Sequence, residues 1–216
     1  MSHGYPPIEV KRALRREVNF GCPVPGCGNP LLTWHHFDPP WKVREHHNVE
    51  GMIALCTRHH PMADAGIYST EQLRDYKRIP NSTQFIKNKF EWMPEHSLIR
   101  LGGCYAFDWC RITIQGTVVL EIAKDDSGLT ATDLILEDHN SRILAQMSDN
   151  LLTASPEDFH DLAVSASGNR VTIWYDQKRI GFDFRYSRKP PEEIERLITA
   201  NLAAAPYWRL PATVQR

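Results

Sequence analysis

Cys22 to His60 reads CPVPGCGNPLLTWHHFDPPWKVREHHNVEGMIALCTRHH, and this segment holds three of the five cysteines and six of the ten histidines. A Cys-x4-Cys pair opens the segment, two adjacent histidines lie in its middle, and Cys-x2-His followed by a further histidine closes it. Thiolates and imidazoles are the ligands that tetrahedral zinc takes in proteins. The order and spacing predict two metal sites, one closed and one open to reactants.

Four residues are expected to form the closed site. Cys22 and Cys27 lie on one knuckle rich in proline and glycine, and Cys56 and His59 lie on another that turns into a helix. Three thiolates and one imidazole are a common ligand set of structural zinc, and a filled set predicts an ion that staples a small domain together. The alternative interpretation is that the cysteines are buried thiols of an ordinary core.

The open site is expected from the remaining histidines. His60 directly follows His59, so it points to another side of the helix start, and Asp64 follows one turn later on the same face. His35 and His36 alternate on a predicted strand, so one can bind a metal while the other acts on a water. Two imidazoles and a carboxylate suit metal-assisted phosphodiester hydrolysis with a neutral histidine as base. The alternative is solvated or capping histidines with no metal between them.

The residues Trp34 to Pro39 and Met52 to His60, with Cys22 and Cys27 upstream, resemble the HNH endonuclease family, also called His-Me finger or ββα-metal nucleases. The resemblance covers about residues 20–80 and points to the zinc-knuckle type found in bacteria. It implies a metal-dependent endonuclease that hydrolyses DNA phosphodiester bonds, with RNA not excluded. It also implies a structural Zn²⁺ and a catalytic divalent metal, either Mg²⁺, Mn²⁺ or Ni²⁺.

The resemblance assigns roles to individual residues. His36 is the general base that activates water, and His35 and His60 hold the catalytic metal. Asp64 matches a position at which some members supply a third ligand. The small fold that the resemblance implies is a ββα-metal domain.

One position departs from the family pattern. The asparagine that fixes the loop around the base usually stands about five residues before the second knuckle, where this chain has Gly51. Asn48, or His47, is expected to take this role from a shifted loop. If neither residue does, the chain is a nuclease-inactive zinc-binding module for nucleic acid or protein, which is the alternative function.

Charge is unevenly distributed along the chain, whose net charge is −1. Residues 1–90 carry 12 Lys and Arg against 8 Asp and Glu, whereas residues 91–216 carry 13 against 18. A local basic patch suffices for phosphate contacts. Lys42, Arg44 and Arg58 are the expected nucleic-acid contacts, the alternative being solvated side chains. The adjacent pair His46-His47 is interpreted as solvated, the alternative being extra metal ligands or phosphate contacts.

The expected fold class is α+β, in three zones. Residues 1–20 form a basic helix, either packed on the body or serving as a DNA-backbone arm. Residues 21–80 form the zinc-stapled domain, 81–90 a linker, and 91–216 a β-rich accessory domain that ends in a helix from Pro190 to about Ala203. The accessory domain is the expected surface for a homodimer or a protein partner. Strands are predicted at Arg111–Gln115, Thr117–Ala123, Thr130–Leu136, Arg142–Met147, Arg170–Tyr175 and Arg179–Tyr186.

The composition excludes several classes of protein. Apolar residues make up 42% and charged residues 24%, as in ordinary globular domains. No apolar run is long enough to cross a bilayer, and the first residues lack the apolar core of a secretory signal. The odd number of cysteines argues against a disulfide framework. We therefore expect a cytoplasmic protein with no membrane partner.

Overall fold

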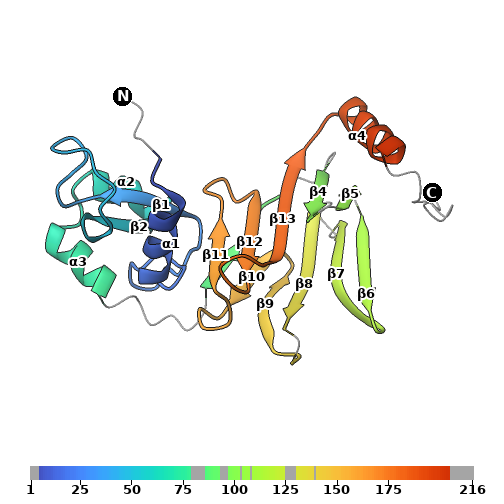
Figure 1. The fold of residues 1–216 in the computed structure, drawn as a ribbon, viewed down its shortest axis with the longest axis horizontal. Helices are drawn as coiled ribbons and strands as arrows, with labels where there is room; N and C mark the ends of the chain where they lie inside the picture. The colour runs from blue at the N-terminus through green and yellow to red at the C-terminus, as the bar shows by residue number, and fades with distance from the viewer. Residues whose placement is uncertain are drawn as a thin grey trace.

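The computed structural model describes residues 5–78, 86–92, 97–102, 104–107, 109–124, 130–138 and 140–204. Figure 1 shows two parts side by side, a small part with helices formed by the first third of the chain and a larger part built from strands. Residues 81–85, the first half of the expected linker, lie outside the described residues. No helix in the described ranges is long and apolar enough to cross a membrane.

The small part is built around two antiparallel strands, β1 (Leu32–His36) and β2 (Met52–Cys56). Leu32 lies opposite Cys56 and His36 lies opposite Met52. Every residue of β2 is buried, as expected for a short apolar run bounded by turns. This pairing brings the two central histidines of the sequence to the end of β1 that lies farthest from the second knuckle.

Helices surround this strand pair. Helix α1 packs Leu14 against it, with Val18 just beyond the helix end, and α3 packs Leu73 into the same core. The start of α3 is capped reciprocally, since the Gln72 N–H donates to Ser69 Oγ at 3.1 Å and the Ser69 N–H donates to Gln72 Oε1 at 2.9 Å. The helices are α1 (Ile8–Glu17), the 3-10 helix η1 (Val49–Gly51), α2 (His59–Asp64) and α3 (Thr70–Arg78).

The larger part is a sandwich of two antiparallel sheets. One sheet has the strand order β3-β10-β9-β8-β7-β6 and the other β11-β12-β13-β4-β5. Ile122 of the first sheet and Ile173 of the second are fully buried in one shared cluster, so the sheets pack face to face. Helix α4 (Pro191–Ala204) follows β13 and projects beyond the sheets (Figure 1). The strands are β3 (Ile86–Lys89), β4 (Ser97–Leu101), β5 (Cys104–Phe107), β6 (Cys110–Ile114), β7 (Thr117–Lys124), β8 (Thr130–Glu137), β9 (Ile143–Ser148), β10 (Leu151–Ala154), β11 (Asp161–Val164), β12 (Arg170–Trp174) and β13 (Ile180–Arg188).

The mixed α+β class and the C-terminal helix are confirmed, but the expected linker is partly wrong. Ile86 pairs with Ala154 of β10, and Phe90 is buried in the sandwich core. The β-rich part therefore begins by residue 86 rather than at 91. Strand β3 has a single apolar residue, so its sequence pattern is weak, and its pairing with β10 determines its conformation. Strands β4, β5, β10 and β11 also lie outside the ranges expected from the sequence.

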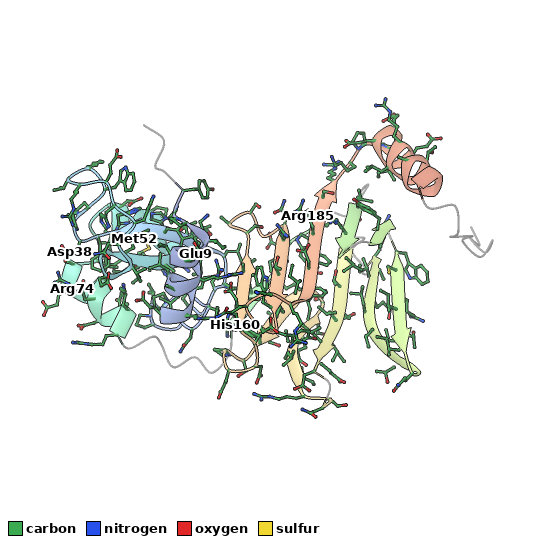
Figure 2. The ribbon with its side chains drawn as sticks, in the orientation of Figure 1. Glu9, Asp38, Met52, Arg74, His160 and Arg185 are labelled. Atoms are coloured by element: carbon green, nitrogen blue, oxygen red, sulfur yellow. The ribbon has the colours of Figure 1, made fainter. Side chains whose placement is uncertain are left out.

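Helix α1 joins the two parts. The Arg15 guanidinium donates two hydrogen bonds to Asp161 of β11, at 2.8 and 2.6 Å, and both side chains are buried. Arg12 Nε lies 3.4 Å from the same carboxylate, and Arg16 contacts His160, which faces α1 across the junction (Figure 2). These arginines bind the sandwich, which favours the packed-helix interpretation of residues 1–20 over the DNA-arm interpretation.

Candidate metal centres and the adjoining cleft

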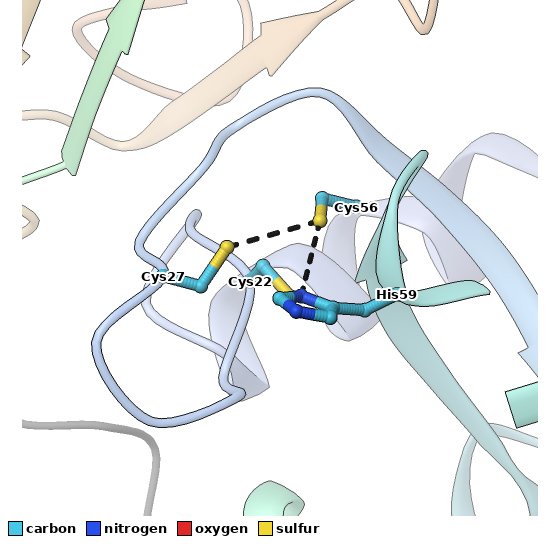
Figure 3. A group of neighbouring side chains, drawn as sticks. All are labelled: Cys22, Cys27, Cys56 and His59. Atoms are coloured by element: carbon cyan, nitrogen blue, oxygen red, sulfur yellow. Dashed lines mark hydrogen bonds between the residues drawn. The ribbon is translucent and has the colours of Figure 1, made fainter. Parts of the chain in front are cut away.

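Cys22, Cys27, Cys56 and His59 converge in the small part (Figure 3). The Sγ atoms of Cys27 and Cys56 lie 3.8 Å apart, and His59 Nδ1 lies 3.3 Å from Sγ of both Cys22 and Cys56. Thiolates about 2.3 Å from a tetrahedral zinc lie roughly 3.8 Å from one another. The four side chains could therefore hold a metal ion, with a donor set that suits zinc, and their expected convergence is confirmed.

The first knuckle owes its shape to two backbone hydrogen bonds and two glycines. The Cys27 N–H donates to the Val24 carbonyl at 3.0 Å, and the Gly28 N–H donates to the Cys22 carbonyl at 3.2 Å. Gly26 has φ of +78° and Gly28 of +62°, a region that other residues enter at a cost. The turn therefore directs both thiols to one side. Residues other than glycine would adopt these two φ values only at a conformational cost.

The second knuckle lies at a strand-to-helix junction. Cys56 ends β2 and His59 begins α2, so the thiol and the imidazole face the first knuckle. Hydrogen bonds from Cys22 and Cys27 hold the pKa of the Cys56 thiol well below its usual range, whereas hydrogen bonds with Cys27 and Cys56 and burial raise the pKa of Cys22. A thiolate is the form of cysteine that binds metal, and the three thiols are close enough to release their protons in favour of one cation.

A second group consists of His35, His60 and Asp64, whose ligand atoms all lie within 4.8 Å of one another. His35 Nδ1 lies 3.0 Å from Asp64 Oδ1, and His60 Nε2 lies 3.6 Å from Asp64 Oδ2. Neighbouring ligands of an octahedral ion with bonds of about 2.1 Å are roughly 3.0 Å apart. The Asp64 side chain is exposed, so these three side chains could hold a cation that keeps positions open to solvent.

The protonation of this group favours ligation. Burial, and then the neighbouring His60, hold the pKa of His35 below its usual value, and Asp64 opposes this only in part. Thr33 Oγ1 donates to the Leu55 carbonyl at 3.0 Å and lies 2.7 Å from His60 Nδ1. Because the hydroxyl proton is used, Nδ1 of His60 is assigned the proton and Nε2 presents its lone pair toward Asp64. No sequence signal marked Thr33 for this role.

His36 lies at the end of β1, next to the His35 ligand position. Its ring is packed between Trp41, with centroids 4.6 Å apart, and His46, 5.1 Å away and perpendicular to it. The His47 ring is 5.8 Å away. The structure thus places the expected base next to one member of the second ligand group, His35, on β1, while His60 and Asp64 come from α2.

The connection from β1 to β2 closes tightly at Gly51. Its carbonyl accepts the N–H of Asp38 at 3.2 Å, and a Cβ at Gly51 would lie 2.0 Å from the Asp38 carbonyl oxygen. No asparagine fits at this position without a shift of the backbone. His46 instead ties the loop together, because its Nδ1 accepts the Asn48 N–H at 3.1 Å and its Nε2 donates to the Pro39 carbonyl at 2.9 Å.

The expectation for Asn48 is not supported by this geometry. The Asn48 side chain is exposed, and within the described part of the chain the structure shows no hydrogen bond from it. His47 stacks on Trp41 at 5.4 Å and does not tie the loop through any contact shown there. The interpretation of His46 as solvated is wrong, since both of its ring nitrogens are bonded. Two adjacent histidines look alike in a sequence, and only the path of the loop distinguishes them.

A cleft of about 900 Å³ runs along β1 beside the second group. His35, His36, His60 and Asp64 line it together with Lys42, and the far wall is Val164 to Ala166, the end of β11 and the first residues of the loop that follows. Arg44 and Arg58, two of the expected nucleic-acid contacts, are exposed and do not belong to this lining. Lys11 of α1 does line the cleft. The sandwich thus completes a site whose other residues come from the small part.

Comparison with known proteins leaves the motifs and the geometry as the basis of any assignment. No protein-family model, curated protein or solved structure matches this chain. The family resemblance therefore rests on residues within about a quarter of the chain, now with two side-chain groups that could hold metal ions.

Proposed function

We propose that this protein is a divalent-metal-dependent endonuclease of the HNH type. It hydrolyses phosphodiester bonds in nucleic acid, with DNA as the expected substrate. The proposal rests on one observation above all: His36 shares a cleft with the group His35, His60 and Asp64. A base and a cation-binding group side by side are what metal-assisted hydrolysis requires. The small part would then be a ββα-metal domain, with β1, β2 and α2 as its elements.

The chemistry assigns His36 the proton of the attacking water. The water oxygen bonds to phosphorus, the bond from phosphorus to the bridging ester oxygen breaks, and that oxygen takes a proton from solvent and leaves as an alcohol, after which His36 returns its proton to solvent. A divalent cation held by His35, His60 and Asp64 supplies, when bound, positive charge for the oxygen that departs. The rings of Trp41 and His46 pack against the His36 ring and so restrict its rotation.

The cysteine-rich group has a different role in this proposal. Four protein ligands leave no open position on a tetrahedral ion, so zinc there is structural. It ties the first knuckle to the start of α2, and α2 carries His60 and Asp64. The structural ion would thus hold the start of the short helix that carries both His60 and Asp64.

Cleavage of supercoiled plasmid tests the proposal. Zinc-loaded protein, freed of loosely bound metal, is refilled with Mg²⁺, Mn²⁺ or Ni²⁺ and compared with His36→Ala, which we expect to cut about 100-fold more slowly. Glu71→Gln, on the exposed face of α3, is the matched control and should cut like the wild type. Cutting by His36→Ala at the wild-type rate would reject this assignment of the base.

One observation favours a second candidate, the nuclease-inactive binding module. Gly51 stands where the family carries its asparagine, and the Asn48 side chain is exposed rather than directed at the loop. In that case the zinc group would preserve the fold and the cleft would bind nucleic acid or protein without hydrolysis. Absence of cutting in every metal, with zinc still bound at one per chain, would support this candidate.

A further inference from the structure

The cleft differs from an open duplex-binding surface in having walls on two sides. Its floor is β1, one wall is the loop carrying Trp41 and Lys42, and the other combines Tyr5 and Lys11 with residues 164–166 of the sandwich. The Arg15–Asp161 pair anchors α1 to β11 and thereby holds the two sides of the second wall together. The shape of the cleft therefore depends on both parts of the molecule.

The size of the cleft limits its occupant. Its volume of about 900 Å³ lies within the range of roughly 300–1,000 Å³ found for sites that enclose a small ligand. Such a space takes a short run of nucleotides, whereas a duplex is a stiff cylinder that would have to lie across the rim. To bring a phosphodiester to His36 on the floor, a strand must enter between the walls.

The lining has the chemistry of a single-strand site. Aromatic side chains of Tyr5, Trp34 and Trp41 face it, and base stacking on aromatic rings is sequence-tolerant because every base has a π-face. Among the lining side chains that the structure describes, the basic ones are Lys11 and Lys42. Two cations match a short strand better than the six to ten phosphate contacts typical of duplex binding.

We infer that the cleft binds an unpaired segment of a nucleic-acid strand, stacked on its aromatic lining, with residues 164–166 of the sandwich as the far wall. This rests on the proposed function and narrows its substrate to single-stranded or locally unpaired regions, of DNA or RNA. Lys11 is then a substrate-binding residue, and the sandwich is part of the substrate site rather than a detached module.

Equilibrium binding to the full-length, zinc-loaded His36→Ala protein tests the inference without cutting. Fluorescent single-stranded DNA, RNA of the same sequence, and the matching duplex are titrated at several salt concentrations. We expect a single strand to bind at least tenfold more tightly than the duplex, with the DNA and RNA arms showing which sugar is preferred. Equal or tighter binding of the duplex would overturn the inference.

Variants in the same background locate the strand. Lys11→Gln should reduce the slope of log K against log salt concentration by about 0.7, the value for one phosphate of a single strand, whereas Lys124→Gln, exposed at the end of β7, should not. Tyr5→Ala should weaken binding about tenfold.

Ala166→Trp should block the cleft, while Gln177→Trp, in an exposed turn of the sandwich, should leave binding intact. An unchanged affinity in Lys11→Gln, Tyr5→Ala and Ala166→Trp would place the strand elsewhere and overturn the inference.

Cleavage by the wild type separates this inference from the proposed function. Tight strand binding with no cutting of any substrate would keep the inference and reject the nuclease. Cutting of fully paired duplex as fast as of single strands would keep the nuclease and reject the inference.

Discussion

His46 and Gly51 determine the local geometry around His36 through contacts with backbone atoms. His46 bonds to the Asn48 N–H and the Pro39 carbonyl, and so bridges two points of the loop that follows β1. Gly51 allows the backbone to approach the Asp38 carbonyl more closely than any side chain would permit. Both residues act on the loop, and the loop in turn positions the rings packed on His36.

Replacing His46 by alanine should therefore affect both stability and cutting. Loss of two hydrogen bonds should lower the free energy of unfolding by about 1–2 kcal/mol, and the freed loop should slow cleavage about tenfold. Urea unfolding and plasmid cleavage measure the two effects. His47→Ala, which removes ring contacts with Trp41 and His36 but neither of the loop hydrogen bonds that His46 makes, is the control. Equal effects of the two variants would contradict a specific role for His46.

Placing an asparagine at Gly51, as in the HNH pattern that the chain resembles, should destabilise this protein. Gly51→Asn places a Cβ where the Asp38 carbonyl lies, so we expect a loss of about 1–3 kcal/mol in the free energy of unfolding. Cleavage should fall with it rather than rise. Thermal unfolding measures the first effect, and a variant that is stable and cuts faster than the wild type would show that the loop adapts.

At the scale of elements, the first knuckle, the end of β2 and the start of α2 form one unit held by Cys22, Cys27, Cys56 and His59. Helix α2 spans His59 to Asp64, and helices this short are unstable alone. A metal ion that binds one residue at its start would fix its direction. The position of the second histidine group therefore depends on the first metal group.

Cys27→Ser should remove the metal and loosen the small part. We expect zinc content near zero by elemental analysis and loss of protection from amide exchange in β1 and α2, because an incomplete ligand set binds zinc weakly. The sandwich, which has its own core, should keep its protection. Cys110→Ser, in β6, should retain one zinc per chain. Zinc retained in full by Cys27→Ser would contradict the assigned ligand set.

At the scale of the whole molecule, the two parts join through a buried charge pair. Arg15 and Asp161 are separated by 146 residues in the sequence and are both buried. Loss of one partner leaves a charge without its counterion in the interior, which costs more than the pair contributes. Residues from both sides of this junction line the cleft, so its shape responds to the pair.

Asp161→Asn should therefore lower the free energy of unfolding by about 3 to 5 kcal/mol, and the double variant Arg15→Met with Asp161→Leu should recover much of that loss. Chemical denaturation of the single and double variants measures the coupling between the two sites. Lys89→Ala, which removes an exposed ion pair with Asp149, should cost under about 1 kcal/mol. If Asp161→Asn lowered the free energy of unfolding by as little as Lys89→Ala, the junction would not be held by this pair.

How much the sequence could predict depends on the separation of the residues involved. The strand that carries His35 and His36 and the final helix follow from patterns a few residues long, and the structure has both of them. Strand β3 was missed because Ile86 alone gives no alternation, and its partner β10 is distant in sequence. The role of His46 was missed because a loop path cannot be read from composition.

The sequence by itself determined the donor chemistry: thiols and imidazoles at spacings that a knuckle and a helix start can direct to one point. Ligands a few residues apart in the sequence stay close in space in any fold that keeps the local turns, because the chain connects them. Only the tertiary structure decided that Asp161 meets Arg15, that His46 ties the loop, and that residues 164–166 close the cleft. These contacts join distant segments, and their geometry follows from how two cores pack against α1, which no local pattern encodes.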